Sequence, residues 1–157
     1  MQGICFITIQ RKALTSLFNL PIDKRMVAWK DFRQQLETVP EPLVSVAELY
    51  SRAPRTKIYS DPYDRTTWPT AWELIEENIY CPLNQLLGVA FTLRLTNRFQ
   101  EWTPTIAITV DKITKSVYYI LYCNDMVYGY EEDAWIEVAR LPKSLSIMKI
   151  YNLDSNH

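Results

Sequence analysis

The chain is short of glycine and histidine, and both shortages exclude classes of function. Only 3 of its 157 residues are glycine, and neither the G-x-G-x-x-G nor the G-x-x-x-x-G-K-[ST] phosphate-binding motif occurs. The single histidine is His157. With no C-x-x-C pair and no second histidine, the sequence predicts no zinc site, and we expect no other metal or cofactor.

Cysteines and long apolar runs are also scarce. Cys5, Cys81 and Cys123 form an odd, widely spaced set, which is typical of a reducing compartment. The first apolar run, from Gly3 to Ile9, has its charges after it, so we do not expect a signal peptide. No run approaches the roughly 20 apolar residues that span a membrane, so no membrane partner is expected.

Net charge is nearly absent, but the charges are unevenly placed. The formal charge of −1 disfavours a general nucleic-acid binder. Residues 1–60 carry 9 basic and 5 acidic side chains, whereas residues 61–157 carry 8 and 13. This asymmetry suits docking to neighbours of opposite sign, with ordinary surface variation as the alternative. The 10 tyrosines and 5 tryptophans also favour protein interfaces.

The first half of the chain predicts helices. Residues 1–20 could be a strand or a docking arm, and a single α+β domain is expected over 21–151, with a frayed tail at 152–157. Apolar residues at helical spacing after Pro21 predict a helix over 22–36. Further helices are expected at three places, namely from the capping box of Ser45 and Glu48 to Tyr50, after the capping box of Thr70 and Glu73, and from Pro82 to Leu95.

Two of these helices carry specific burial predictions. Trp72, Leu74, Ile75 and Ile79 are expected to form the buried face of the helix that Thr70 caps. The helix over 82–95 is apolar around most of its circumference, which indicates a central, buried helix.

The second half of the chain changes to a period of two, which predicts strands. They are expected at 105–111, 116–123, 126–130, 134–139 and 146–151, joined by short turns. The sequence therefore predicts N-terminal helices and a central helix packed on a C-terminal antiparallel meander sheet.

Cys81 is the one candidate nucleophile. It directly precedes Pro82, and a helix N-terminus stabilises a thiolate. A catalytic thiol also needs a base, and the only histidine is the last residue. We therefore interpret Cys81 as a small buried residue, with a nucleophilic Cys81 as the alternative.

The segment from Asp133 to Val138 reads D-A-W-I-E-V. With a cysteine at the start of a buried helix and strands after it, residues 68–139 resemble the transglutaminase-like, papain-related core. In that family a histidine commonly stands where this chain has Asp133. The ordinary pKa of an aspartate is about 4, so it is a poor base for a thiol whose pKa is about 8.5. Its negative charge would also repel a thiolate. The resemblance therefore implies the family's fold without its usual base.

Residues 58–96 contain W-P-T-A-W-E-L-I, then Cys81, then F-T-L-R-L. This arrangement resembles small uncharacterised proteins of tailed bacteriophages. The resemblance implies a phage protein, assembled in the reducing host cytoplasm and carried in the virion as a part of the neck, tail or baseplate.

The connector from Ala53 to Trp68 is polar and long, and loops of this length are commonly functional or clamped to another element. The candidate interaction residues in and beside it are Arg52, Arg55, Lys57, Tyr59, Tyr63 and Trp68. The positive charges and aromatic rings of these residues could contact a nucleic acid or an acidic protein. The acidic runs Glu76-Glu77 and Glu131-Glu132-Asp133 are interpreted as solvated surface, with paired carboxylates for glycosidic or metal chemistry as the alternative.

From these observations we expect a non-catalytic structural or adaptor subunit whose partners are other protein subunits. Neither a nucleic acid nor a small-molecule substrate is expected. Two alternatives stay open: a transglutaminase-like hydrolase or acyl transferase that uses Cys81, and a small phage protein that binds a host protein.

Overall fold

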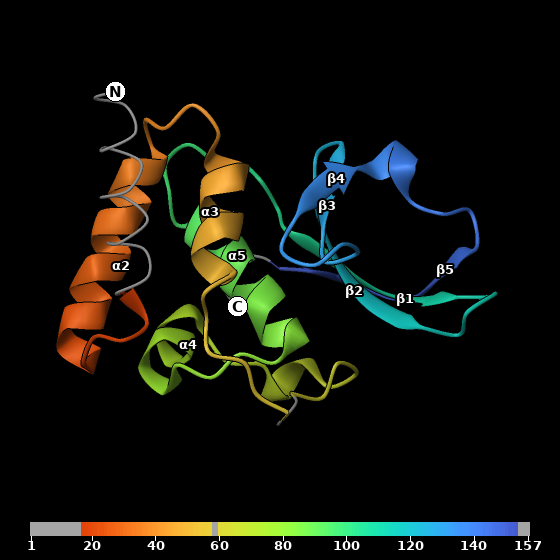
Figure 1. Cartoon of the computed structure of the whole chain (residues 1–157), viewed down its shortest axis with the longest axis horizontal. Helices are drawn as coiled ribbons and strands as arrows, with labels where there is room; N and C mark the ends of the chain where they lie inside the picture. The colour runs from red at the N-terminus through yellow and green to blue at the C-terminus, as the bar shows by residue number, and fades with distance from the viewer. Residues whose placement is uncertain (1–16, 58–59, 154–157) are drawn as a thin grey trace.

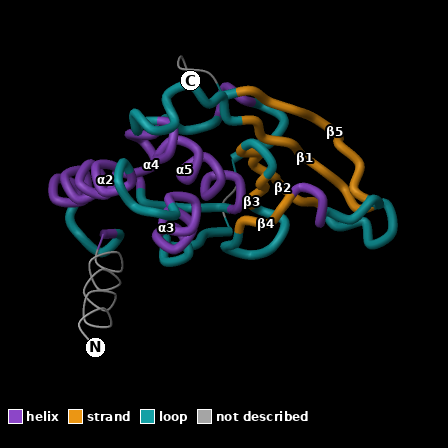
Figure 2. The backbone as a smooth tube through the Cα atoms, turned by 90° about the horizontal axis from the view of Figure 1, so that it is seen from above, coloured by secondary structure: helices purple, strands orange, loops and turns teal. Residues whose placement is uncertain are grey.

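A computed structural model describes residues 17–57 and 60–153, and its architecture is α+β, as the sequence predicts. The helices come first in the chain and lie to one side of a five-stranded antiparallel sheet (Figures 1 and 2). The helices are α2 (Ile22–Leu36), α3 (Pro42–Tyr50), α4 (Ala71–Glu77) and α5 (Pro82–Arg94), with 3-10 turns η1 (Arg65–Thr67) and η2 (Val138–Arg140). No helix in these ranges is both long and apolar enough to cross a membrane.

Proline sets the start of three helices, with Pro21 directly before α2 and with Pro42 and Pro82 as the first residues of α3 and α5. Helix α2 begins directly after Pro21, where the fixed φ of proline suits a helix entry. Helix α3 begins at Pro42, so the predicted capping box of Ser45 and Glu48 is wrong, because Ser45 lies inside the helix. Pro42 occupies the first turn, where its missing N–H costs no hydrogen bond.

Helix α4 has the predicted capping box. Thr70 Oγ1 accepts from the Glu73 N–H at 3.2 Å, and Glu73 Oε1 accepts from the Thr70 N–H at 3.2 Å. Leu74 and Ile75 are buried as expected, but the predicted burial of Trp72 and Ile79 is wrong, because both are exposed. The helix ends early, at Asn78 in the left-handed conformation, so Ile79 falls outside the helical period.

Helix α5 is the buried centre of the molecule. Its residues from Leu83 to Leu93 are all buried, including Asn84, Gln85 and Thr92. It packs against α3, α4 and the sheet strand β2. A helix enclosed on all sides needs the apolar circumference that the sequence shows.

The sheet has the order β4-β3-β2-β1-β5. Strands β1 (Thr105–Asp111), β2 (Val117–Cys123), β3 (Met126–Tyr128) and β4 (Trp135–Glu137) form the predicted meander. Strand β5 (Leu145–Asn152) returns to the far side of β1 and pairs with it antiparallel. The register between β1 and β5 shifts between Ile108 and Thr109, which leaves Met148 without a partner opposite it.

The two faces of the sheet bury different cores. The face toward the helices contributes Ile106, Ile108, Leu121 and Tyr128 to the main core. The opposite face holds a smaller cluster of Ile120, Val127 and Ile136. Alternate residues of each strand serve the two faces, as the pleat requires.

At both ends of the described chain, the structure departs from the predicted domain boundaries. Most of the possible N-terminal strand or arm, residues 1–16, lies outside the described residues, whereas Leu17 and Phe18 pack in the main core. At the other end, Asn152 is the last residue of β5 and Leu153 is buried, so order extends two residues beyond 151. Residues 154–157 of the predicted tail lie outside the described ranges.

Candidate binding site

Cys81 stands at the start of α5, but its side chain faces the interior. Pro82 occupies the first turn of the helix and Cys81 is its N-cap. The Cys81 Sγ accepts from the Asn84 N–H at 3.4 Å and is fully buried. The thiol therefore serves as a weak helix cap, and a substrate has no open path to it in this conformation.

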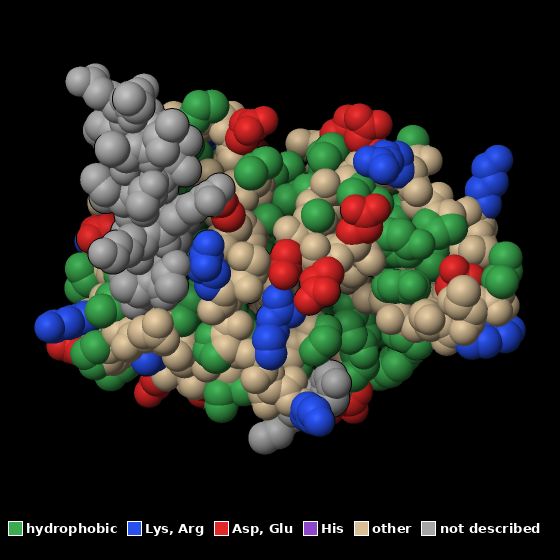
Figure 3. All heavy atoms as spheres, in the orientation of Figure 1, with side chains coloured by type: hydrophobic (Ala, Val, Ile, Leu, Met, Phe, Trp, Pro, Cys, Tyr) green, Lys and Arg blue, Asp and Glu red, His purple; other side chains and the backbone are tan. Residues whose placement is uncertain are grey.

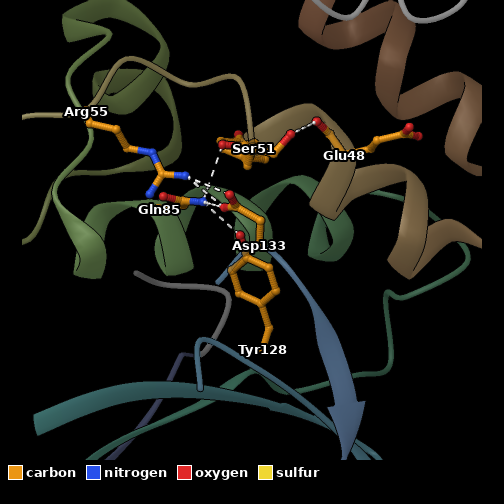
Figure 4. Close-up of polar contacts among 7 residues, drawn as sticks. Glu48, Ser51, Arg55, Gln85, Tyr128 and Asp133 are labelled. Carbon is orange, nitrogen blue, oxygen red and sulfur yellow. Dashed lines mark hydrogen bonds and ion pairs between the residues drawn. The ribbon is translucent and has the colours of Figure 1, made fainter. Parts of the chain in front are cut away.

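Asp133 is the residue that stands in the histidine's place of the papain-related pattern. It lies just before β4 with φ of 58°, a left-handed conformation that aspartate tolerates. Its carboxylate accepts from Arg55 at 2.8 and 3.1 Å and from Gln85 Nε2 at 2.7 Å (Figure 4). Asp133 thus reaches α5 at Gln85, one turn beyond Cys81.

Gln85 joins this carboxylate to the sheet and to α3. Its Nε2 also lies 2.9 Å from the Tyr128 hydroxyl and 3.3 Å from the Tyr50 carbonyl oxygen. Burial raises the pKa of Tyr128 to about 12, so its hydroxyl keeps its proton at neutral pH. We call Arg55, Gln85, Tyr128 and Asp133 the Asp133 cluster.

The connector brings Arg55 into the cluster. Residues 54–56 run beside Tyr80, with the Thr56 N–H donating to the Tyr80 carbonyl at 3.2 Å and the Tyr80 N–H to the Pro54 carbonyl at 3.1 Å. Because Tyr80 directly precedes Cys81, this pairing holds Arg55 near the start of α5. The connector is therefore clamped to the helical layer at this point.

The Asp133 cluster ties elements together, because the Asp133 carboxylate is bonded to Arg55 on the connector and to Gln85 on α5. Arg55 and Asp133 are 44% and 24% exposed, and an ion pair with that exposure contributes at most about 1 kcal/mol to stability. Both oxygens of the Asp133 carboxylate already accept hydrogen bonds. The arrangement fixes the segment before β4 against α5 and α3.

Two surface grooves share Asp133 as a lining residue. The α3 groove has a volume of about 610 Å³ and is lined mainly by Leu43, Val44, Ala47, Met126, Ala134 and Trp135. The α5 groove is smaller, at about 290 Å³, and lies between the start of α5 and the segment from Gly129 to Asp133. Gly129 is required here, because its φ is 110° and an added Cβ would lie 2.1 Å from the Tyr119 carbonyl oxygen.

Acidic side chains border both grooves. Glu41 and Glu48 line the α3 groove, Glu131 and Glu132 line the α5 groove, and Asp133 lines both. Figure 3 shows acidic side chains on this face between the helical part and the sheet, with basic side chains among them. Arg55 is the one basic side chain among the described residues that line the two grooves.

The six candidate interaction residues do not form one surface. Arg55 belongs to the Asp133 cluster, whereas Lys57 and Tyr63 are exposed elsewhere on the connector and Arg52 is exposed just before it. Trp68 is buried against Tyr151 and donates from Nε1 to the Asp61 carbonyl at 2.8 Å. Tyr59 lies outside the described residues.

Gln85 and Tyr128 are site residues that the sequence did not indicate. A usable signal was the polar Gln85 on a helix that is otherwise apolar around its circumference, because a buried amide needs partners. Tyr128 carries no such signal, since it fits an alternating strand like any other aromatic residue.

The other described cysteine, Cys123, is also buried. Burial and the nearby Asp125 charge raise the pKa of the Cys123 thiol to about 11. Within the described ranges, no three His, Cys, Asp or Glu side chains are placed to hold a metal ion together.

Comparison of the sequence with models of known protein families and with curated proteins finds no match in either set.

Proposed function

We propose that this chain is a non-catalytic binding subunit of a larger protein assembly, and more specifically a part of a tailed-phage particle. The observation that carries the proposal is an apolar surface on β5. Ile147, Met148 and Ile150 are 52%, 57% and 50% exposed, side by side on one strand. Adjacent exposed apolar residues of this kind mark contact surfaces on soluble proteins.

The position of β5 tells how the contact would be made. It is the last strand in the sheet order, and Ile147 and Ile150 lie opposite Thr109 and Ala107 on the face turned away from the helices. The shift at Met148 and the neighbouring Lys149 are features that disfavour pairing with another strand. A partner is therefore expected to pack on the side chains of β5, not to extend the sheet.

The phage assignment rests on the resemblance of residues 58–96, and the test is direct. Particles purified on a density gradient are analysed by peptide mass spectrometry for this chain. We expect it as a stoichiometric component, and an Ile147→Glu/Ile150→Glu double variant that folds normally should be lost from the particles. Val27→Glu, which alters an exposed apolar residue on α2, is the matched control and should be retained.

A chain that is absent from particles and remains a monomer in sedimentation would overturn the proposal. The enzyme alternative has its own test, because it requires an accessible Cys81. In the folded chain at neutral pH, we expect iodoacetamide to label Cys81 far more slowly than free cysteine, with full labelling after denaturation. Fast, selective labelling of native Cys81 would favour the enzyme.

A further inference from the structure

The α3 and α5 grooves share Asp133 and are together called the joined groove. The joined groove combines an apolar floor with an acidic border. Leu43, Ala47, Met126 and Trp135 supply apolar surface from both a helix and the sheet. With each described lining residue taken once, the two grooves hold five carboxylates and one guanidinium, a formal charge of −4. The formal net charge of the whole chain is only −1, so negative charge is concentrated around these two grooves.

Charge of one sign around a low-dielectric concave surface attracts a ligand of the opposite sign. A nucleic acid backbone would be repelled by these carboxylates. A cationic partner with apolar side chains satisfies both parts of the groove, because its apolar anchors can leave water while its cations stay at the border. Amphipathic peptide segments bind apolar grooves in this way.

We propose that the joined groove binds a basic amphipathic segment of a partner protein. Apolar anchors of that segment occupy the α3 groove beside Trp135, and its Lys or Arg side chains lie over Glu41, Glu48, Glu131 and Glu132. The inference rests on the proposed role as a protein-binding subunit and adds a second partner surface, separate from β5. The Asp133 cluster holds the two grooves in a fixed relation, because Asp133 lines both and is bonded to α5.

The probe is a fluorescein-labelled peptide of about 18 residues, or five helical turns, made of Leu and Lys with the leucines along one face. Fluorescence anisotropy with the full chain should show saturable binding that weakens as salt is added. A peptide with Glu in place of Lys should not bind. The Glu41→Lys/Glu48→Lys double variant should weaken binding by about tenfold or more, because it places like charges against the peptide.

Two further variants separate charge from packing. Val44→Asn replaces an exposed apolar side chain of the α3 groove by a polar one without changing the charge, and should also weaken binding. Glu76→Lys/Glu77→Lys reverses two exposed acids on α4, outside both grooves, and should leave binding unchanged. Circular dichroism and thermal unfolding establish that each variant is folded.

Three results would overturn the inference. The first is that the Leu/Lys peptide does not bind. The second is that the groove variants and the α4 variant bind the peptide equally well. The third is that a monomeric alkylammonium amphiphile binds in the groove whereas the peptide does not. Each leaves the proposed function standing if the chain is still found in particles and depends on Ile147 and Ile150. Peptide binding at the groove by a chain that is absent from particles would overturn the phage assignment alone.

Discussion

At the scale of single residues, the buried Thr92 hydroxyl makes three hydrogen bonds. Its Oγ1 accepts from Trp29 Nε1 at 3.0 Å, lies 2.9 Å from the Tyr50 hydroxyl, and donates to the Gly88 carbonyl at 2.7 Å. One fully buried hydroxyl therefore joins α2, α3 and α5. Buried polar networks of this kind stabilise a core only when each member is satisfied.

Replacing Thr92 by valine keeps the shape and removes the hydroxyl. The buried Trp29 Nε1 then loses its acceptor, so we expect the free energy of unfolding to fall by about 2 kcal/mol, measured by urea denaturation. Thr92→Ser keeps the hydroxyl and loses a methyl group, which should cost only about 1 kcal/mol. A valine variant as stable as the serine variant would show that this hydrogen bond contributes little.

At the scale of elements, the contact between α3 and α5 depends on a glycine. A Cβ placed on Gly88 would lie 2.5 Å from Tyr50 Cε1 and 2.9 Å from its Cζ. The Tyr50 ring cannot move aside easily, because it is fully buried and packs edge-on against Phe18 and Tyr80. Gly88 therefore sets how closely the two helices approach.

Gly88→Ala tests this approach. Alanine favours a helix by up to about 1 kcal/mol over glycine, but overpacking a core typically costs about 1–3 kcal/mol. We expect the clash to dominate and the urea midpoint to fall. In a Tyr50→Leu background the same substitution should be close to neutral, and an equal penalty in both backgrounds would contradict the role of the ring.

At the scale of the whole molecule, the buried tyrosines and Cys123 link stability to alkaline pH. Burial raises the pKa of Cys123 to about 11 and of Tyr128 to about 12, and it also raises the pKa values of Tyr50 and Tyr80. The unfolded groups ionise earlier, near pH 9 for cysteine and 10 for tyrosine. Above these values the unfolded state binds fewer protons, so stability falls as pH rises.

The expected slope is about 1.4 kcal/mol per pH unit for each group that stays protonated only when folded. Urea midpoints measured between about pH 8 and 11 should decline progressively, and most steeply once tyrosine ionises in the unfolded chain. Tyr128→Phe removes one such group and should reduce the slope above about pH 10. Midpoints that stay constant over this range would contradict the burial of these groups.

Much of the fold follows from local sequence signals. Prolines and hydrophobic periodicity predict α2 and α5, the Thr70 capping box predicts α4, and alternation predicts all five strands. These signals succeed because helix entry and side-chain period are properties of neighbouring residues. They fail at α3, which begins at Pro42 and not at the predicted capping box of Ser45, and at Trp72, whose exposure depends on what packs on α4.

The sequence by itself determined the fold class, the central position of α5 and the presence of a single histidine, at position 157. Only the tertiary structure decided that Cys81 is buried, that Asp133 bonds to Gln85 and Arg55, and that β5 lies beside β1 with Ile147 and Ile150 exposed. The reason is that these features join residues up to 78 positions apart in the chain. Local propensity constrains each element, whereas packing alone selects which distant side chains meet and which stay exposed.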